Sequence, residues 1–314
     1  MPNGIKILRQ STSGNYIVSV VIGRDYLQKW TSICKKNWLK YCDKHDLGLA
    51  ILNKPTNIKN RNPHWQKYFI GNDLAQLTKI DNICYMDYDV LINPNAENIF
   101  TTFNKDKIGL VSQERNLPYS DSGQIRKTIS FYRNYYLDPK YPLNSALLFN
   151  TAQRYESFGL KDQNDYACMG VFIYNYSKFQ GFLSQIAENH SGTENVLDSG
   201  DELIMNHHIL SKNLHSWLDY SWQALWLYEV ATNYSHLYED RFQCISDNYK
   251  AISSCLKRVN FLHFAGSWEK AAFDTLEEFW ESNQYGDMSH LENFLSQNIV
   301  PKEYGRITLE TTAE

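Results

Sequence analysis

The sequence predicts an α/β protein whose mixed, mainly parallel sheet is flanked by helices. Short, β-branched apolar runs alternate with segments that carry apolar side chains at helical spacing. The runs are largely apolar, which is typical of strands buried on both faces. The length of 314 residues also suits one large domain of this class or two ordinary domains.

The first half of the chain contains three expected strands separated by two expected helices. The run YIVSVVIG, residues 16–23, is the first strand, and LGLAIL, residues 47–52, is the second. Helical spacing of apolar residues predicts helices at 26–44 and 64–77. The third strand is NICYMDYDVLI, residues 82–92. Because ligands bind beyond the carboxyl ends of parallel strands, we expect a site near the end of this third strand.

The second half of the chain has a looser pattern. Strands are expected at GLVSQE, residues 109–114, and at CMGVFIYN, residues 168–175. The polar, tyrosine-rich segment 115–145 between them is interpreted as an insertion or lid on the acceptor side rather than as sheet. Two helices are expected at 178–189 and 201–210. A short last strand is expected at 259–266, and an amphipathic helix at 273–298.

Neither repeats nor a clear linker divide the chain, so one domain is the simplest interpretation. We expect that domain to span residues 1–270 and to carry a helical C-terminal appendage at residues 271–314. Within the aromatic stretch 217–229, Trp222 and Trp226 are four apart and are expected to share a helix face, either in the core or as an acceptor-sugar platform.

Composition excludes some partners and favours a cytoplasmic location. The net charge of −4 gives no general reason to bind nucleic acid, because binding is driven by a basic excess. The six cysteines form no C-x-x-C pair, so reduced thiols are expected. The N-terminus lacks the apolar core of a signal peptide, and no apolar run approaches the roughly 18 to 20 residues that span a bilayer. A peripheral membrane contact stays open.

Two carboxylates, Asp87 and Asp89, follow the apolar part of the third strand. Residues two apart on a strand point to the same face, so the pair is expected to converge, with Tyr88 turned away. Their mutual repulsion requires a positive partner, and a divalent cation with hard oxygen ligands is suitable. Such a metal keeps open positions for a diphosphate. The alternative is a solvated turn or a helix N-cap.

Five short segments follow one another within residues 16–270: HWQK, YMDYDVLINPNAENIF with its D-x-D, CMGVFIYN, DELIMN and HFAGSWEK. In this order they resemble nucleotide-sugar glycosyltransferases with the GT-A fold, and in particular retaining families eight, thirty-four and six. Two departures stand out. Cys168 and Met169 replace an Asn and a small residue that are frequent in relatives, and Lys270 lies one residue late after His263.

The resemblance implies a set of site residues. Asp87, Asp89 and His263 are the implied ligands of Mn²⁺ or Mg²⁺, and Asp201 and Glu202 are the implied catalytic residues. For each there is an alternative: His263 as an ordinary core histidine, and the acidic pair as N-terminal charges of a helix. The implied donor-binding residues are Gly23, Asp25, Tyr26, Lys67, Asp87, Tyr88, Gly170, Gly266 and Lys270.

The resulting functional prediction is a metal-dependent glycosyltransferase. It moves a sugar from a nucleotide-diphosphate donor, a UDP-sugar, to a hydroxyl of a glycan acceptor with retention, and Tyr132, Tyr135 and Tyr136 are candidate acceptor contacts. A non-catalytic carbohydrate-binding protein is one alternative. A sugar-nucleotide pyrophosphorylase is another, but GRDYLQKW, residues 23–30, is a poor match to its glycine-rich, arginine-containing loop.

Overall fold

The computed structural model describes residues 4–56, 63–119, 121–136, 149–190, 201–266 and 269–281. Within these ranges the strands form a seven-stranded sheet of order β1-β3-β2-β4-β7-β6-β8 and a three-stranded sheet of order β5-β10-β9. The large sheet consists of β1 (Ile5–Arg9), β2 (Asn15–Val20), β3 (Gly48–Leu52), β4 (Asn82–Met86), β6 (Ile108–Ser112), β7 (Ala167–Asn175) and β8 (His215–Leu218). The small sheet consists of β5 (Val90–Ile92), β9 (Ala224–Leu225) and β10 (Phe261–His263).

The strand directions confirm a mixed, mainly parallel sheet. β2 is parallel to β3 and β4, and β6 is parallel to β8. β7 runs antiparallel to both β4 and β6, and β1 runs antiparallel to β3. Within the described chain, five of the seven strands of this sheet therefore share one direction.

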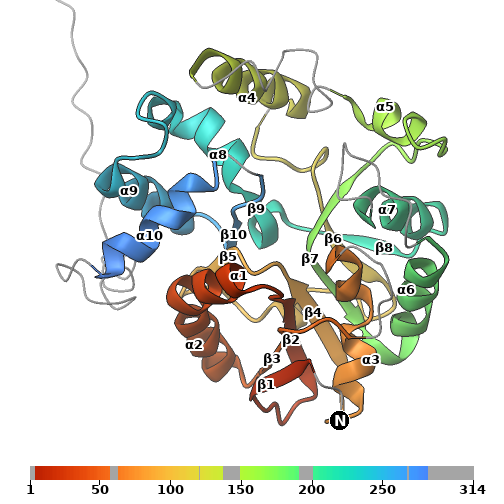
Figure 1. Cartoon of the computed structure of the whole chain (residues 1–314). Helices are drawn as coiled ribbons and strands as arrows, with labels where there is room; N and C mark the ends of the chain where they lie inside the picture. The colour runs from red at the N-terminus through yellow and green to blue at the C-terminus, as the bar shows by residue number, and fades with distance from the viewer. Residues whose placement is uncertain are drawn as a thin grey trace, which may run out of the picture.

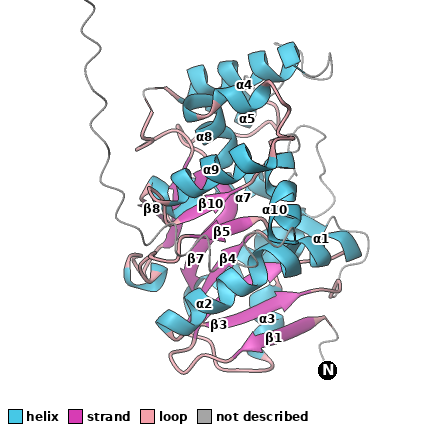
Figure 2. Ribbon diagram, turned by 90° about the vertical axis from the view of Figure 1, so that its left-hand side faces the viewer, coloured by secondary structure: helices cyan, strands magenta, loops and turns pink. Residues whose placement is uncertain are grey.

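Helices cover both faces of the large sheet (Figure 1). On β2, Tyr16 and Val18 pack into one core cluster and Ile17 into the other, so the strand is buried on both faces. Figure 2 shows α2 and α10 in front of the strands and α4 at the top of the molecule. The helices are α1 (Arg24–Lys29), α2 (Lys35–His45), α3 (Ile70–Ala75), α4 (Ser122–Tyr136), α5 (Thr151–Glu156), α6 (Tyr176–His190), α7 (Asp201–Ser211), α8 (Trp226–Asn233), α9 (Ile245–Leu256) and α10 (Ala271–Glu281).

Two expected helices are present but interrupted. The helix expected at 26–44 consists of α1, a π-helical turn at Trp30–Cys34 and α2. The helix expected at 64–77 is a 3₁₀ helix at Pro63–Tyr68 followed by α3. Helical periodicity marks the buried face in each case, but it does not distinguish these variants from a regular α-helix.

The expected third strand at 82–92 is in fact two strands in two sheets. β4 ends at Met86, and the chain turns through Asp87, Tyr88 and Asp89 before β5. β5 then pairs antiparallel with β10, which places Val90 opposite His263. The apolar pattern concealed this change of sheet because both halves are completely buried.

The segment 115–145, interpreted as an insertion or lid rather than as sheet, contains α4, a helix of 15 residues. α4 lies with α5 above the sheet (Figure 1) and packs against α8. Its buried residues include Ile125 and Ile129, four apart on one face, and this spacing explains the helix despite the polar composition. Residues 120 and 137–145 of this segment lie outside the described residues.

The aromatic stretch 217–229 belongs to the core. Trp222 lies in a 3₁₀ helix at Tyr220–Gln223, and Trp226 begins α8 after the short strand β9. The expectation that these tryptophans share a helix face is therefore wrong, because a strand separates them. Both are buried, with 4% and 0% of their surface exposed, which favours the core alternative over a sugar platform.

The C-terminal helix α10 packs against the rest of the domain. Ala272, Phe273 and Leu276 are buried in the same core cluster as the residues of α9, and Lys29 Nζ pairs with Asp274 Oδ2 at 2.8 Å. The appendage expected from residue 271 is therefore continuous with the core over these residues. None of the helices that the structure describes has the length and hydropathy that crossing a bilayer requires.

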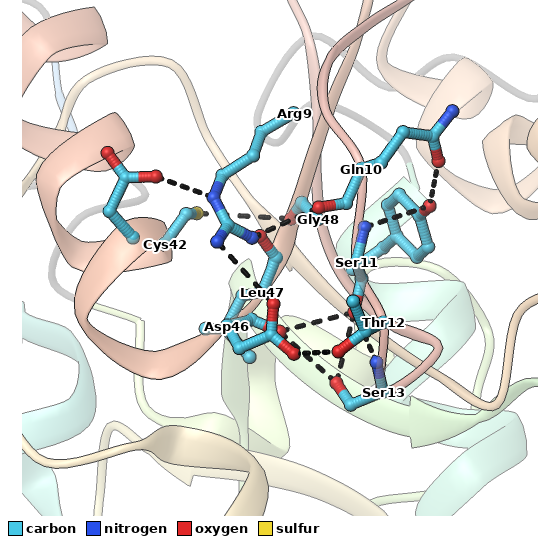
Figure 3. A network of polar contacts seen from close by, with 11 residues as sticks. Arg9, Gln10, Ser11, Thr12, Ser13, Cys42, Asp46, Leu47 and Gly48 are labelled. Carbon is cyan, nitrogen blue, oxygen red and sulfur yellow. Dashed lines mark hydrogen bonds and ion pairs between the residues drawn. The ribbon is translucent and has the colours of Figure 1, made fainter.

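A polar network fixes the edge of the sheet at the loop between α2 and β3 (Figure 3). Asp46 ends α2 in the left-handed region, at φ 52°, and its carboxylate accepts a hydrogen bond from Thr12. Arg9 on β1 pairs with Asp43 at 2.6 Å and with Asp46 at 3.5 Å. The N-terminal strand is thus tied to the first strand–helix–strand unit on the side away from α4 and α5.

Candidate active site

Asp87, Asp89 and His263 converge where β4, β5 and β10 meet. His263 Nε2 lies 3.6 Å from Asp87 Oδ2 and 3.5 Å from Asp89 Oδ1. One ligand atom from each of the three lies within 4.8 Å of the others. Asp89 and His263 are 4% and 3% exposed, and the side chain of Asp87 is 32% exposed. Two carboxylates held this close at a largely buried site favour a bound cation. A mixed oxygen and nitrogen donor set suits Mn²⁺.

The backbone holds this arrangement from both sheets. Asp87 N donates to Gly170 O on β7 at 2.8 Å, and Phe264 N donates to Asp89 O at 3.0 Å. The Tyr85 hydroxyl donates to Asp87 Oδ1 at 2.7 Å. The backbone of Asp87 is therefore held by β7 and that of Asp89 by the residue after β10, while Tyr85 holds the Asp87 carboxylate.

Gln223 fixes the orientation of the His263 ring. With its amide oriented to satisfy its neighbours, Gln223 donates to Cys168 O at 3.0 Å and accepts from Val171 N and His263 Nδ1, both at 3.1 Å. His263 Nδ1 then donates to Gln223, and Nε2 is the nitrogen that faces the two aspartates. Burial alone would lower the pKa of His263, but Asp89 and Asp87 raise it. Nε2 is therefore the nitrogen that a metal would bind in place of a proton, and outer partners such as Gln223 raise metal affinity.

Replacing Gln223 with methionine tests this orientation. Because methionine preserves the shape but cannot accept the Nδ1 proton, we expect the affinity for Mn²⁺ to fall about 10- to 100-fold. Isothermal titration with MnCl₂ measures the change, and circular dichroism checks the fold. An unchanged Mn²⁺ affinity would show that Gln223 does not support a metal ligand.

Gly170 leaves the space that the His263 ring occupies. A Cβ atom at this position would lie 2.2 Å from His263 Cε1 and 2.8 Å from Asp87 Oδ2. The glycine is therefore required by close approach of side chains and not by a left-handed backbone. The resemblance implied a donor contact for Gly170, and the structure places it behind two of the candidate ligands.

We expect Gly170→Ala to displace His263 and to weaken Mn²⁺ binding by at least about tenfold, as loss of ligand positioning does elsewhere. Gly181→Ala is the matched control, because a Cβ at this exposed position of α6 meets nothing within 4 Å. The control should retain Mn²⁺ affinity and gain about 0.5–1 kcal/mol in the free energy of unfolding. Equal Mn²⁺ affinity in the two variants would contradict the positioning role.

Lys270 adds a positive charge beside the cluster. Its Nζ lies 2.5 Å from Asp89 Oδ2 and 4.2 Å from the centre of the Tyr88 ring. Burial alone would raise the pKa of Asp89, but Lys270 and His263 lower it to about 2. Asp89 is therefore ionised at neutral pH. Tyr88 in turn packs edge-on against Tyr26, with ring centres 5.1 Å apart.

A cavity of about 730 Å³ opens over this cluster. Several of the predicted site residues line it: Tyr26, Asp87, Tyr88, Asp89, Glu202, His263, Gly266 and Lys270. The structure does not place Gly23, Asp25, Lys67, Gly170 and Asp201 on its wall. Gly23 precedes α1 with φ at 113°, and Asp25 is exposed in the first turn of that helix.

Glu202 is held on the cavity wall by three donors. Its Oε1 accepts from Met169 N at 3.1 Å and from Cys168 Sγ at 3.6 Å, and its Oε2 accepts from the Tyr166 hydroxyl at 2.9 Å. Asn206, one helical turn later in α7, exchanges two hydrogen bonds with the backbone of Ala167, each of 2.8 Å. These contacts join the start of α7 to β7 and hold Glu202 on the wall of the cavity that the three candidate metal ligands also line.

Lys67 and Asp201 form a buried ion pair behind that wall. Lys67 Nζ lies 2.6 Å from Asp201 Oδ2, and the two side chains are 4% and 0% exposed. The Tyr68 hydroxyl also donates to Asp201 Oδ2, at 2.8 Å. Burial alone would lower the pKa of Lys67, but Asp201 raises it above its ordinary value, so Lys67 stays charged. The two residues thus contact each other instead of the cavity.

Sequence reasoning missed several residues of the site. Gln223 and Tyr166 support His263 and Glu202, and three arginines, Arg126, Arg133 and Arg154, line the cavity. Gln223 lies 40 positions before its histidine, and no local pattern links the two. Arg126 and Arg133 lie on α4, inside the segment interpreted as a lid, and Arg154 lies on α5, just after that segment. Basic residues in a lid were the signal available for the first two.

The sequence matches no known family model and no curated protein. Its fold is similar to a glycosyltransferase involved in glycosylation of the major capsid of PBCV-1, with 10% identity, a TM-score of 0.47 and coverage of 84% of this chain and 98% of that one. It is also similar to the bifunctional glycosyltransferase WbbM, with 10% identity, a TM-score of 0.47 and coverage of 87% of this chain and 51% of that one. The galactosyltransferase LgtC, in complex with donor and acceptor sugar analogues, is similar with 12% identity, a TM-score of 0.42 and coverage of 85% of this chain and 99% of that one. At these scores the similarities assign the chain to no family.

Proposed function

We propose that the protein is a metal-dependent glycosyltransferase with a GT-A arrangement of its sheet. It transfers a sugar from a nucleotide-diphosphate donor, a UDP-sugar, to a hydroxyl of a glycan acceptor. The observation that carries the proposal is the convergence of two carboxylates and a tautomer-fixed histidine on the wall of a 730 Å³ cavity at the edge of the sheet. Such a site binds a cation and leaves room for a substrate beside it.

Asp87, Asp89 and His263 are the proposed ligands of Mn²⁺, with Mg²⁺ as the alternative. When bound, the metal supplies the positive charge that stabilises the departing nucleoside diphosphate. Lys270 supplies a second positive charge, 2.5 Å from Asp89, on the same side of the cavity. It is therefore the proposed direct contact for a phosphate oxygen.

The nucleoside is proposed to bind near the end of β2. Tyr26 is 51% exposed and lies edge-on to Tyr88, which offers an aromatic surface to a base. Gly23 and Asp25 flank this surface at the start of α1. Gly266, at φ 99°, adopts a backbone conformation that glycine tolerates and lets the chain approach the diphosphate closely.

Glu202 is the proposed catalytic carboxylate. It lines the cavity that the candidate metal ligands also line, so it can stabilise the positive charge that develops at the anomeric carbon. Alternatively, it can attack that carbon and displace the nucleoside diphosphate; the acceptor hydroxyl then displaces Glu202 and loses its proton, and the two inversions together retain the configuration. Asp201 is fully buried, and its proposed role is to hold the start of α7 in place through Lys67 and Tyr68.

The proposal is tested by incubating the protein with a panel of UDP-sugars, with and without Mn²⁺, and measuring release of UDP. We expect release that depends on Mn²⁺ with at least one donor. A carbohydrate-binding protein would release no UDP, and a pyrophosphorylase would instead form a nucleotide sugar from a nucleoside triphosphate and a sugar phosphate. For an active donor, ¹H NMR of the first product reports whether the anomeric configuration is retained.

A further inference from the structure

The cavity that the metal-ligand cluster lines also has basic residues on its wall. Arg126 on α4 and Arg154 on α5 both line it, together with Tyr228 on α8. Burial raises the pKa of Tyr228, whereas Arg126 and Arg154 both act to lower it. Both guanidinium charges are therefore close enough to influence this phenol. These three residues are called the arginine wall.

Arg126 carries donor capacity that the protein does not use. Its Nη1 donates to Glu114 Oε1 at 2.9 Å, but among the described residues its buried Nε has no hydrogen-bond partner. The residue is only 3% exposed. A buried guanidinium N–H without an acceptor is costly, so an oxygen of a ligand in the cavity is the natural partner.

Arg133 differs from the arginine wall although it lines the same cavity. Its Nε and Nη2 donate to the two carboxylate oxygens of the buried Glu269, at 2.9 and 2.5 Å. The Tyr238 hydroxyl donates to the same carboxylate at 3.2 Å. Arg133 thus uses its Nε on Glu269, whereas Arg126, whose charge is paired with Glu114, has an Nε without a partner among the described residues.

The strand order places Glu114, which holds Arg126 of the arginine wall, at the end of a different strand from the proposed donor site. In the order β2-β4-β7-β6, the nucleoside surface follows β2 and Asp87 follows β4. Glu114, which holds Arg126, follows β6, two strands beyond β4. At roughly 4.8 Å per strand, Glu114 lies about 10 Å across the sheet from Asp87 and about 14 Å from the nucleoside end. The transferred sugar and its acceptor fit between.

We propose that the arginine wall binds an acidic group, a carboxylate or a phosphate ester, on the acceptor. This inference rests on the proposed function. A planar guanidinium pairs with two oxygens of either group, and burial strengthens the pairing. Leu225 and Leu227, which line the cavity beside Tyr228, give the sugar ring an apolar surface. The structure therefore favours an acidic glycan over a neutral one as acceptor.

The first experiment measures binding without any donor. Glucose 6-phosphate, glucuronate and glucose are each titrated into the protein, and their affinities are compared. We expect the two acidic sugars to bind at least about tenfold more tightly than glucose. Arg154→Gln and Arg126→Lys should each reduce that ratio about tenfold; Arg154 is half-buried, and lysine at 126 preserves the pair with Glu114. Lys127→Gln is the matched control, because Lys127 is exposed on the same helix and should leave the ratio unchanged.

The second experiment measures UDP release with neutral acceptors and their uronic-acid or 6-phosphate counterparts. We expect a preference of at least about tenfold in kcat/KM for the acidic acceptor, and its loss in Arg154→Gln. Equal use of both acceptors, or a preference that survives in Arg154→Gln, overturns the inference and leaves the proposed function standing. If Arg154→Gln instead weakens binding of UDP and Mn²⁺, the wall binds the donor. Arginine-dependent binding of acidic sugars without UDP release from any donor refutes the proposed function alone.

Discussion

Asp89→Asn should reduce Mn²⁺-dependent UDP release at least about 1,000-fold, or about 4 kcal/mol in activation free energy. Asp89 is the most buried carboxylate of the cluster, and it contacts both His263 at 3.5 Å and Lys270 at 2.5 Å. The amide preserves the shape but removes the negative charge, so the affinity for a divalent cation falls with the rate. Electron paramagnetic resonance of bound Mn²⁺ and a UDP-release assay measure the two effects.

Asp106→Asn is the matched control for this substitution. Asp106 is an exposed carboxylate that pairs with Lys178 and does not line the cavity. It should retain both Mn²⁺ binding and UDP release. If Asp89→Asn bound Mn²⁺ as tightly as this control and released UDP as fast, the proposed metal site would be refuted.

The part of the site that was predictable from the sequence has local signals. Asp87 and Asp89 follow an apolar strand two residues apart, and His263 follows another short apolar run and precedes a glycine. An apolar strand followed by polar side chains is formed by consecutive residues, so one short stretch of sequence is enough to predict it. The structure brings these three side chains together, and their binding of a metal stays a prediction.

The remainder depended on contacts between distant segments. Gln223 contacts His263, which lies 40 positions later in the chain. Lys67, in a 3₁₀ helix, pairs with Asp201 at the start of α7. No pattern within one segment shows which charge another segment will neutralise. Lys67 in particular reads as a donor contact in its motif, yet its charge is taken up by Asp201.

The same applies to the division between the two sheets. β4 and β5 are both buried at every position, so residues 82–92 look like one strand. What separates them is the pairing of β5 with β10, more than 160 residues away in the chain. That pairing brings His263 to Asp89, so the division of the expected strand and the position of this candidate ligand have the same physical cause.

Lys67→Met should lower the free energy of unfolding by about 3–5 kcal/mol, because it leaves the charge of Asp201 buried without a partner. Asp201 is 0% exposed, and its Oδ1 has no hydrogen-bond partner among the described residues. The Tyr68 hydroxyl, at 2.8 Å from Oδ2, is then the remaining donor in contact with the carboxylate. Urea unfolding followed by circular dichroism measures the loss.

The double variant Lys67→Met/Asp201→Leu separates a structural pair from a donor contact. Replacing both charges with apolar groups of similar volume removes the unpaired charge, so most of the lost stability should return. Lys178→Met, which breaks only the exposed pair with Asp106, is the control and should leave the free energy of unfolding nearly unchanged. A double variant as unstable as Lys67→Met would mean that Lys67 stabilises the fold by packing. If Lys67→Met were as stable as the unmodified protein but had a raised KM for the UDP-sugar, Lys67 would contact the donor instead of stabilising the fold.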